Sequence, residues 1–281
     1  MTSIKELKSI DLASYTIIST ALSILIAILL SIGIALGILI LIPQASEIVI
    51  YLIPTLVVGT FMIGIYRYFS EGLFYNLLAT RLRNIKIELE GEEITKISPT
   101  ETATLVATIA LIQAILIYLV SVLLLPLFFS ALMQTVMLSN QALAYSLYQI
   151  LLLLSQPMTV LMFIFGTFVI TFIFVLIGVY IYNVLASKGR GVVLGLSEEN
   201  GLTAIDSIDM MKFAIVIAVI SGILSLITGI ISLISGGNVI TLIGNVIISI
   251  ISGFVAAALI AIFYNYLAPK IGKIKIELID S

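Results

Sequence analysis

The sequence predicts an all-α polytopic membrane protein with six transmembrane helices, arranged as three two-helix repeats with short cytoplasmic β-strands after and between the repeats. Composition is the first reason. The 281 residues are 61% hydrophobic and 10% charged, whereas soluble domains are about 25% charged. The second reason is six apolar runs, each long enough to cross a hydrocarbon core of about 30 Å. The third is a tyrosine–asparagine motif that returns after every second run.

This motif, called here the Tyr-Asn signature, occurs in three copies that align without a gap. In each copy Tyr-Asn is followed by two hydrophobic residues, an alanine and, two positions later, a basic residue. The signature residues are Tyr75, Asn76 and Arg81; Tyr182, Asn183 and Lys188; and Tyr264, Asn265 and Lys270. The chain therefore divides into repeats at residues 1–92, 93–200 and 201–281.

The six spans are expected over the apolar runs. Their expected bounds are about 15–42, 48–68, 102–133, 159–182, 210–233 and 239–266. The first run exceeds a signal-peptide core of about 7–15 residues and is expected to be retained as a membrane helix. Arg67 and Glu71 lie four residues apart at the end of the second span and are predicted to pair.

Residues 134–158 interrupt the repeat pattern. The chain from Tyr75 to Tyr182 is 25 residues longer than the chain from Tyr182 to Tyr264, which is about the length of this stretch. We interpret it as an outer segment inserted into repeat 2, interfacial or re-entrant. The alternative is a seventh span, which would move the C-terminal lysines to the side opposite the other basic residues.

Basic residues predict the orientation. All 13 Lys and Arg residues fall at or beside one face of the six-span arrangement, and the turns on the other face contain none. By the positive-inside rule, we expect a multi-pass protein of the cell membrane with both termini and all three signatures in the cytoplasm. The lipid bilayer is therefore one expected partner.

Short strands are expected on the cytoplasmic side, where apolar and charged residues alternate with a period of two. The expected strands are 84–90 and 273–279, with residues 94–98 pairing with the first. Since a lone two-stranded ribbon is marginal, we expect strands from different repeats to join in one sheet of up to six strands. The alternative is three independent flaps at the headgroups. An exposed sheet edge would be a docking place for a membrane or cytoplasmic protein partner.

The asparagines of the signature allow two interpretations. Asn76, Asn183 and Asn265 either line a cytoplasmic vestibule as a ring of amides, or each bonds a neighbouring element and fixes the packing of its repeat. We expect the second, because an unsatisfied carboxamide is costly near lipid. The tyrosines suit the headgroup zone, and the basic signature residues are expected to reach lipid phosphates.

Small residues recur at four-residue spacing on the first, fifth and sixth spans, which places each series on one helix face. Ser221, Ser225 and Gly229 form such a series on the fifth span. We interpret these series as tight helix packing. The alternative is a pore lined by the serines.

The ends of the repeats carry a family resemblance. Residues 94–99 read Ile-Thr-Lys-Ile-Ser-Pro, and residues 75–90 and 264–279 combine the Tyr-Asn signature with a closing Ile-Lys-Ile-Glu strand. These motifs resemble a family of short two-span membrane proteins of uncharacterised function. The middle tail departs from the pattern at Val193 and Gly195, which weakens the expectation of a strand there. The resemblance implies a two-span unit, of which this chain would be a covalent pseudo-trimer, and it implies no activity.

Catalytic chemistry is not expected. The chain has no Cys and no His, and the interior of the expected spans has no charged residue. We therefore predict no catalytic, cofactor-binding or metal-binding residues, and we predict that the protein is not an enzyme. A net charge of −2 argues against nucleic acid as a partner. The expected function is a non-catalytic membrane scaffold or accessory subunit. The alternative is a channel or passive transporter with a path between the three repeats.

Overall fold

A computed structural model describes most of the chain. The described residues are 2–43, 46–139, 141, 145–146, 148–149, 152 and 156–280. The chain forms two compact units, of which unit 1 comprises Met1–Thr102 and Ile177–Ser281, and unit 2 comprises Ala103–Leu176.

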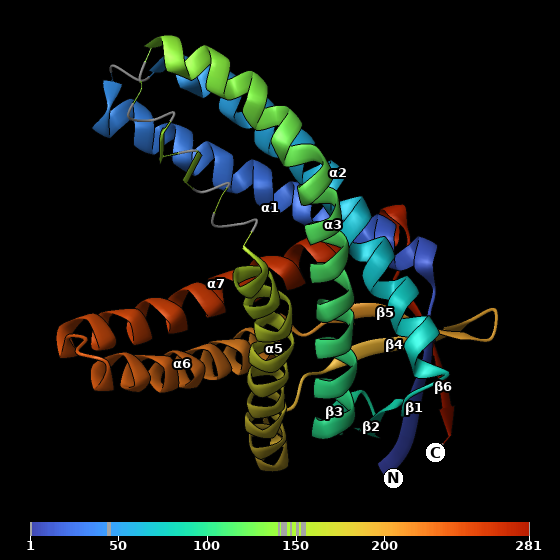
Figure 1. Cartoon of the computed structure of the whole chain (residues 1–281). Coiled ribbons are helices and arrows are strands. Elements are labelled where there is room, and N and C mark those ends of the chain that lie inside the picture. Colours follow the sequence, from blue (N-terminus) through green and yellow to red (C-terminus); the bar gives the residue numbers. More distant parts are fainter. Residues whose placement is uncertain are drawn as a thin grey trace. The chain divides into compact units, whose positions relative to one another are not determined.

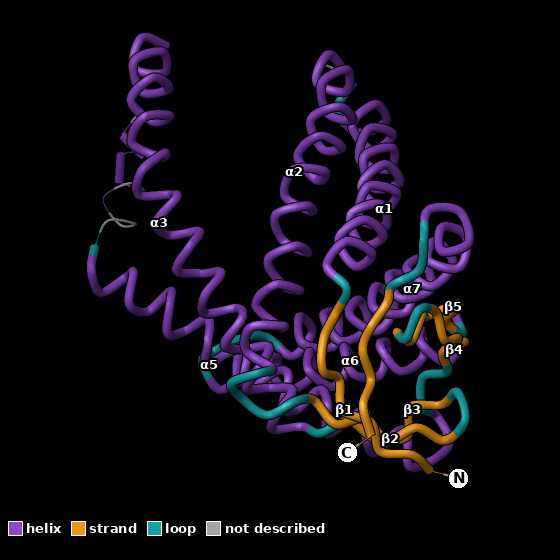
Figure 2. Tube along the Cα trace, turned by 90° about the vertical axis from the view of Figure 1, so that its right-hand side faces the viewer, coloured by secondary structure: helices purple, strands orange, loops and turns teal. Residues whose placement is uncertain are grey.

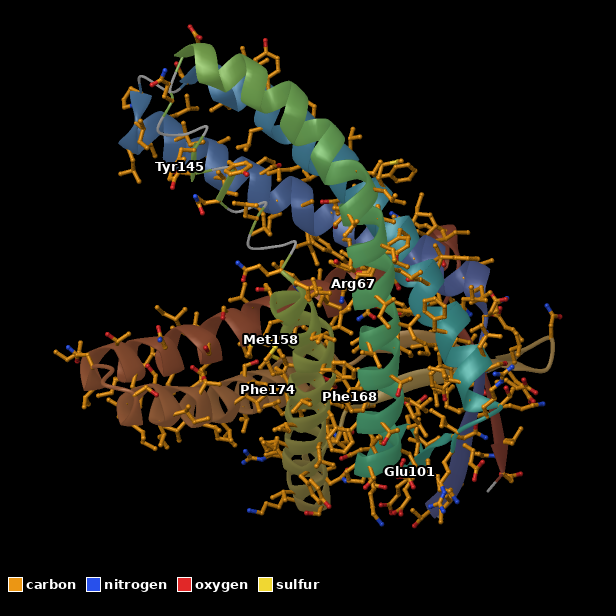
Figure 3. All side chains as sticks on the ribbon, viewed as in Figure 1. Arg67, Glu101, Tyr145, Met158, Phe168 and Phe174 are labelled. Carbon is orange, nitrogen blue, oxygen red and sulfur yellow. The ribbon has the colours of Figure 1, made fainter. Side chains whose placement is uncertain are left out.

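Six helices in the described part of the chain are long and apolar enough to cross a membrane, which confirms the six-span prediction at the level of length and composition. These helices are α1 (Leu12–Leu41), α2 (Ser46–Ala79), α3 (Pro99–Ser139), α5 (Pro157–Leu185), α6 (Met210–Ile234) and α7 (Val239–Ile271). Large apolar side chains project outward along them, as Met158 and Phe174 do on α5 (Figure 3). Such exposed apolar surface suits contact with lipid.

Helices α2 and α3 extend beyond the expected spans. Helix α2 continues to Ala79 instead of residue 68, and α3 continues to Ser139 instead of residue 133. The expected limits marked the end of each apolar run, but a helix ends only where its hydrogen bonding ends. In α2 the backbone N–H groups of Arg81 and Leu82 both bond to the carbonyl of Leu78 and close the last turn. The remainder of the expected insertion at 134–158 lies mostly outside the described residues.

Helices α1 and α6 begin in the same way. The carboxylate of Asp11 accepts a hydrogen bond of 2.8 Å from the backbone N–H of Ser14, and that of Asp209 accepts one of 2.9 Å from Lys212. Each aspartate thus caps one of the free N–H groups at a helix start. Residues 9–11 and 207–209 both read Ser-Ile-Asp, and the aspartate caps the following helix in both repeats.

Helices α6 and α7 lie side by side in unit 1 (Figure 1). Glycines bring their backbones close together, because a Cβ on Gly222 would lie 2.5 Å from Ile250 and one on Gly253 would lie 2.8 Å from the Ser221 hydroxyl oxygen. A Cβ on Gly229 would lie 2.8 Å from Leu242. The small-residue series of the fifth span thus faces α7, as expected for close helix packing.

Six strands of unit 1 form one antiparallel sheet in the order β3-β2-β1-β6-β5-β4 (Figure 2). They are β1 (Thr2–Ile10), β2 (Ile85–Glu90), β3 (Glu93–Ile97), β4 (Leu194–Glu199), β5 (Leu202–Ile208) and β6 (Lys275–Asp280). Each strand that leads into a repeat alternates with one that leaves a repeat. The prediction of a joined sheet is confirmed, the alternative of independent flaps is wrong, and the middle tail does form a strand.

The two outer strands of the sheet, β3 and β4, meet at one point. Glu93 of β3 forms a bridge with Val193 beside β4. The N–H of Ile94 bonds to the carbonyl of Val192, and the N–H of Leu194 bonds to the carbonyl of Glu92, both at 2.9 Å. The two edges therefore touch at this bridge, while in the described part of the chain the rest of β4 pairs only with β5. Sequence alternation identifies strands but does not fix which edges remain open.

The two faces of the sheet differ in chemistry. Ile85 and Leu89 of β2 are buried, and Ile205, Ile208 and other apolar residues pack on a core cluster that contains Tyr264 and Ile18. The opposite face carries ion pairs, such as Lys86 with Glu6 across β2 and β1. The apolar face thus joins the sheet to the helix ends of the same unit.

Candidate functional site

The three tyrosines of the signature lie buried at the sheet-proximal ends of α2, α5 and α7, with 5%, 6% and 1% of Tyr75, Tyr182 and Tyr264 exposed. Their hydroxyl groups donate to backbone carbonyls of the strands that lead into the same repeats. The acceptors are Leu7 for Tyr75 at 2.5 Å, Ile94 for Tyr182 at 2.6 Å, and Ile205 for Tyr264 at 2.5 Å.

The same hydroxyls also receive hydrogen bonds from the backbone that follows each signature. Val192 N–H donates to Tyr182 at 3.1 Å, and Ile274 N–H donates to Tyr264 at 3.2 Å. The backbone of Ile85 bonds to Tyr75 in the same way. One phenol group therefore links the incoming and outgoing chain of each repeat, which satisfies two backbone groups that would otherwise be costly to bury.

The three asparagines each make a paired contact with a single strand residue. Asn76 accepts from the N–H of Ile10 at 2.8 Å, and its amide donates to the carbonyl of Ile10 at 2.8 Å. Asn183 makes the equivalent pair with Ile97 at 2.9 and 2.8 Å. Asn265 makes it with Ile208 at 2.8 and 2.9 Å. Each carboxamide thus fills one donor and one acceptor position on the backbone.

Tyrosine and asparagine together form what we call a strand anchor. In every repeat the tyrosine binds a strand residue three positions before the one that the asparagine binds, as with Leu7 and Ile10 in repeat 1. The pairs in repeats 2 and 3 are Ile94 with Ile97 and Ile205 with Ile208. The anchor fixes the incoming strand of each repeat to the end of its second helix.

The basic residues of the signature do not take part in the anchors. Arg81, Lys188 and Lys270 are exposed and lie where each helix gives way to a strand. Lys270 Nζ lies 3.3 Å from the ring centroid of Tyr266. In repeats 2 and 3 the chain turns at Gly189 and Gly272, whose φ angles of 71° and 115° favour glycine.

Ion pairs on the outer face of the sheet connect repeats 2 and 3. Lys273 and Lys275 bond to Glu199 of repeat 2 at 2.6 and 3.0 Å, and Lys273 also bonds to Asp206 of its own repeat at 2.7 Å. Hydrogen bonding from Lys273 holds the pKa values of both carboxyl groups below their usual range and raises the pKa of Lys273 itself. Exposed pairs of this kind contribute modestly to stability but favour one strand order.

Two further ion pairs cross between repeats. Lys8 of repeat 1 bonds to Glu277 of repeat 3 at 2.8 Å, and hydrogen bonding from Lys8 lowers the pKa of Glu277. Lys212 of repeat 3 bonds to Glu93 of repeat 2 at 2.9 Å and lowers the pKa of Glu93. The charged residues of the tails thus complement each other between repeats.

A polar cluster on α1 and α2 was only partly expected. Arg67 pairs with Glu71 at 2.9 Å, as predicted. Glu71 also accepts from the hydroxyl of Tyr15 at 3.1 Å, and the Ser23 and Tyr68 hydroxyls lie 2.6 Å apart. The spacing of Arg67 and Glu71 revealed their pairing, but no signal in the sequence connects residues on two different helices.

In the part of the chain that the structure describes, no group of three or more acidic residues could hold a metal ion. Comparison with protein-family models, curated proteins and solved structures finds no match. Function must therefore be argued from the arrangement of the anchors, the sheet and the helices.

Proposed function

We propose that the protein is a non-catalytic membrane scaffold or accessory subunit, a covalent pseudo-trimer whose sheet lies on the cytoplasmic side of the cell membrane. One observation carries the proposal: the strand anchor recurs with the same atoms and the same three-residue offset in all three repeats. A contact that recurs for a structural reason is expected in a protein whose role is to hold helices in a fixed arrangement.

The orientation rests on the distribution of charge. Twelve of the 13 basic residues lie in the chain segments beside the sheet or at the helix ends next to it, and Arg67 lies in the half of α2 nearer the sheet. Positive charge of this kind is retained in the cytoplasm during membrane insertion. The sheet and both termini are accordingly assigned to the cytoplasm.

The channel alternative gains no support from the asparagines. Each carboxamide is held by a backbone N–H and a backbone carbonyl of one strand residue, for example Ile97 in the case of Asn183. These bonds give each amide a structural role that needs no vestibule. Ser221, a candidate pore residue, lies against Gly253 of α7.

The outer sheet face is the proposed docking surface for a protein partner. Because the two outer strands already meet at the Glu93–Val193 bridge, contact with exposed side chains is favoured over strand addition at an edge. Ile4 and Ile279 are 48% and 37% exposed, on the adjacent strands β1 and β6. Two exposed branched residues beside ion pairs are suited to an apolar contact with a polar rim.

Purification of the tagged full chain from its native membranes in mild detergent tests this function. A stoichiometric partner should co-purify and should be lost from Ile4→Asp and Ile279→Asp. Asn200→Asp, in the turn between β4 and β5, adds the same charge away from the proposed docking surface and should retain the partner. Absence of any partner, together with solute flux in liposomes that contain the purified chain, would overturn the scaffold proposal in favour of a channel.

A further inference from the structure

The basic residues of the chain fall into two groups. Eight form ion pairs with carboxylates: Lys5, Lys8, Arg67, Lys86, Lys96, Lys212, Lys273 and Lys275. The other five have no carboxylate partner among the described residues: Arg81, Arg83, Lys188, Arg190 and Lys270. All five are exposed and lie at the three helix-to-strand junctions.

The junctions share a position relative to the apolar helices. Arg81 and Arg83 follow the end of α2 at Ala79, and Lys270 lies in the last turn of α7, which ends at Ile271. Lys188 and Arg190 lie in the segment Ala186–Arg190 that follows α5, where the backbone leaves helical geometry at Lys188 and Gly189. The unpaired cations therefore lie where spans of suitable length reach the surface of a bilayer.

We propose that the junctions bind the anionic headgroups of phospholipids. The Arg guanidinium and Lys ammonium groups are suited to phosphate, and basic residues beside a membrane helix are attracted to anionic lipid. Leu82, which separates the two arginines, is 42% exposed, and Ile271, beside Lys270, is 43% exposed. An exposed apolar residue next to a cation outside the ion pairs fits a lipid, which offers an acyl chain beside its phosphate, better than a soluble anion.

The three junctions differ in the number of cations that lie outside the ion pairs. Those of repeats 1 and 2 each offer two free cations, separated by one residue. In repeat 3 the second lysine of the junction, Lys273, is held by Glu199 and Asp206. Only Lys270 remains, and it lies over the Tyr266 ring. Repeats 1 and 2 therefore bind anionic lipid more tightly than repeat 3.

Native mass spectrometry of the purified full chain, titrated in detergent with phosphatidylglycerol or phosphatidylcholine, tests the proposal. Since each basic residue near an anionic surface contributes about 1 kcal/mol, its loss weakens binding about five-fold. R81Q/R83Q and K188Q/R190Q should each lose about 25-fold in affinity for phosphatidylglycerol at one site, and K270Q about five-fold. The matched control is K8Q/K96Q, which removes two exposed cations that are ion-paired and should leave binding unchanged.

Three results would overturn the assignment. Equal affinity for phosphatidylcholine would remove the role of charge, and an equal loss in K8Q/K96Q would show that net charge alone matters. Displacement of phosphatidylglycerol by glycerol 3-phosphate at similar concentration would assign the sites to soluble phosphates.

An unchanged unfolding temperature in each variant excludes misfolding as the cause of weaker lipid binding. None of these measurements depends on a protein partner, so the proposal of lipid sites and the proposal of a scaffold are tested independently.

Discussion

At the scale of single residues, the tyrosine hydroxyl of each anchor serves two backbone groups at once. Tyr264→Phe would leave the Ile205 carbonyl and the Ile274 N–H without this partner in a buried setting. We expect a loss of about 1–3 kcal/mol in unfolding free energy. Thermal unfolding in detergent measures it, with Tyr266→Phe as the control because Tyr266 is 57% exposed. Equal unfolding temperatures in the two variants would contradict the anchor's role.

The asparagine contact predicts a comparable effect. Asn183→Ala removes both hydrogen bonds to Ile97 and should cost about 2 kcal/mol, at about 1 kcal/mol for each bond. Asn245→Ala provides the same substitution at an exposed position of α7 and should be neutral or slightly stabilising, since Ala favours helix. Chemical denaturation followed by circular dichroism compares them. A similar midpoint for both variants would show that the paired contact is energetically unimportant.

These residues could be found from the sequence, but their partners could not. The spacing of Tyr75, Asn76 and their equivalents marked the signature without any structural knowledge. Their partners are backbone atoms, for example those of Leu7 and Ile10. Nearly every residue type has the same backbone N–H and carbonyl groups. The pattern of side chains in the sequence therefore does not show which backbone group an anchor residue binds.

At the scale of elements, close helix packing depends on where each glycine lies. A Cβ on Gly222 would lie 2.5 Å from Ile250, whereas Gly244 has nothing within 4 Å. Since Ile is stiff at χ1, Gly222→Ala should push α6 from α7 and cost about 1–3 kcal/mol. Gly244→Ala should be neutral or stabilising. Unfolding temperatures in detergent distinguish them, and a stabilised Gly222→Ala would show that the helices are not packed this closely.

The sheet predicts a response to acid. The pKa values of Glu199 and Asp206 lie below their usual range because of hydrogen bonds from Lys273. Carboxylates of this kind stabilise the fold above their unfolded pKa values of about 4, and the contribution is lost as pH falls further. Lys273→Gln should therefore flatten the acid side of the stability profile. Lys270→Gln, a cation outside the ion pairs, should leave that profile unchanged, and matching curves for the two variants would refute the assignment.

Element order shows where sequence reasoning stops. Alternation in residues 84–90 and 273–279 located two strands to within about two residues of β2 and β6. It did not reveal that Glu93 and Val193 would form a bridge between the two outer strands. Strand pairing depends on the relative positions of segments far apart in the chain, and local periodicity contains no such information.

At the scale of the whole molecule, the anchors explain how three repeats with different span sequences can build one sheet. The spans match between repeats only in hydrophobicity, while the anchor positions agree atom for atom. Lipid-facing positions tolerate any apolar side chain of suitable size, but the strand ends must meet in register. Variation is therefore expected in the spans, and constancy at the junctions.

The pairing of the first strand with the last has a consequence for biosynthesis. Lys5 of β1 meets Asp280 of β6, 275 residues further along the chain. The ribosome delivers β1 first, and all six apolar helices must be made before β6 can join it. Helix insertion therefore proceeds while one side of β1 has no partner strand, and this interval is when a nascent chain is most open to capture by chaperones or by strands of neighbouring chains.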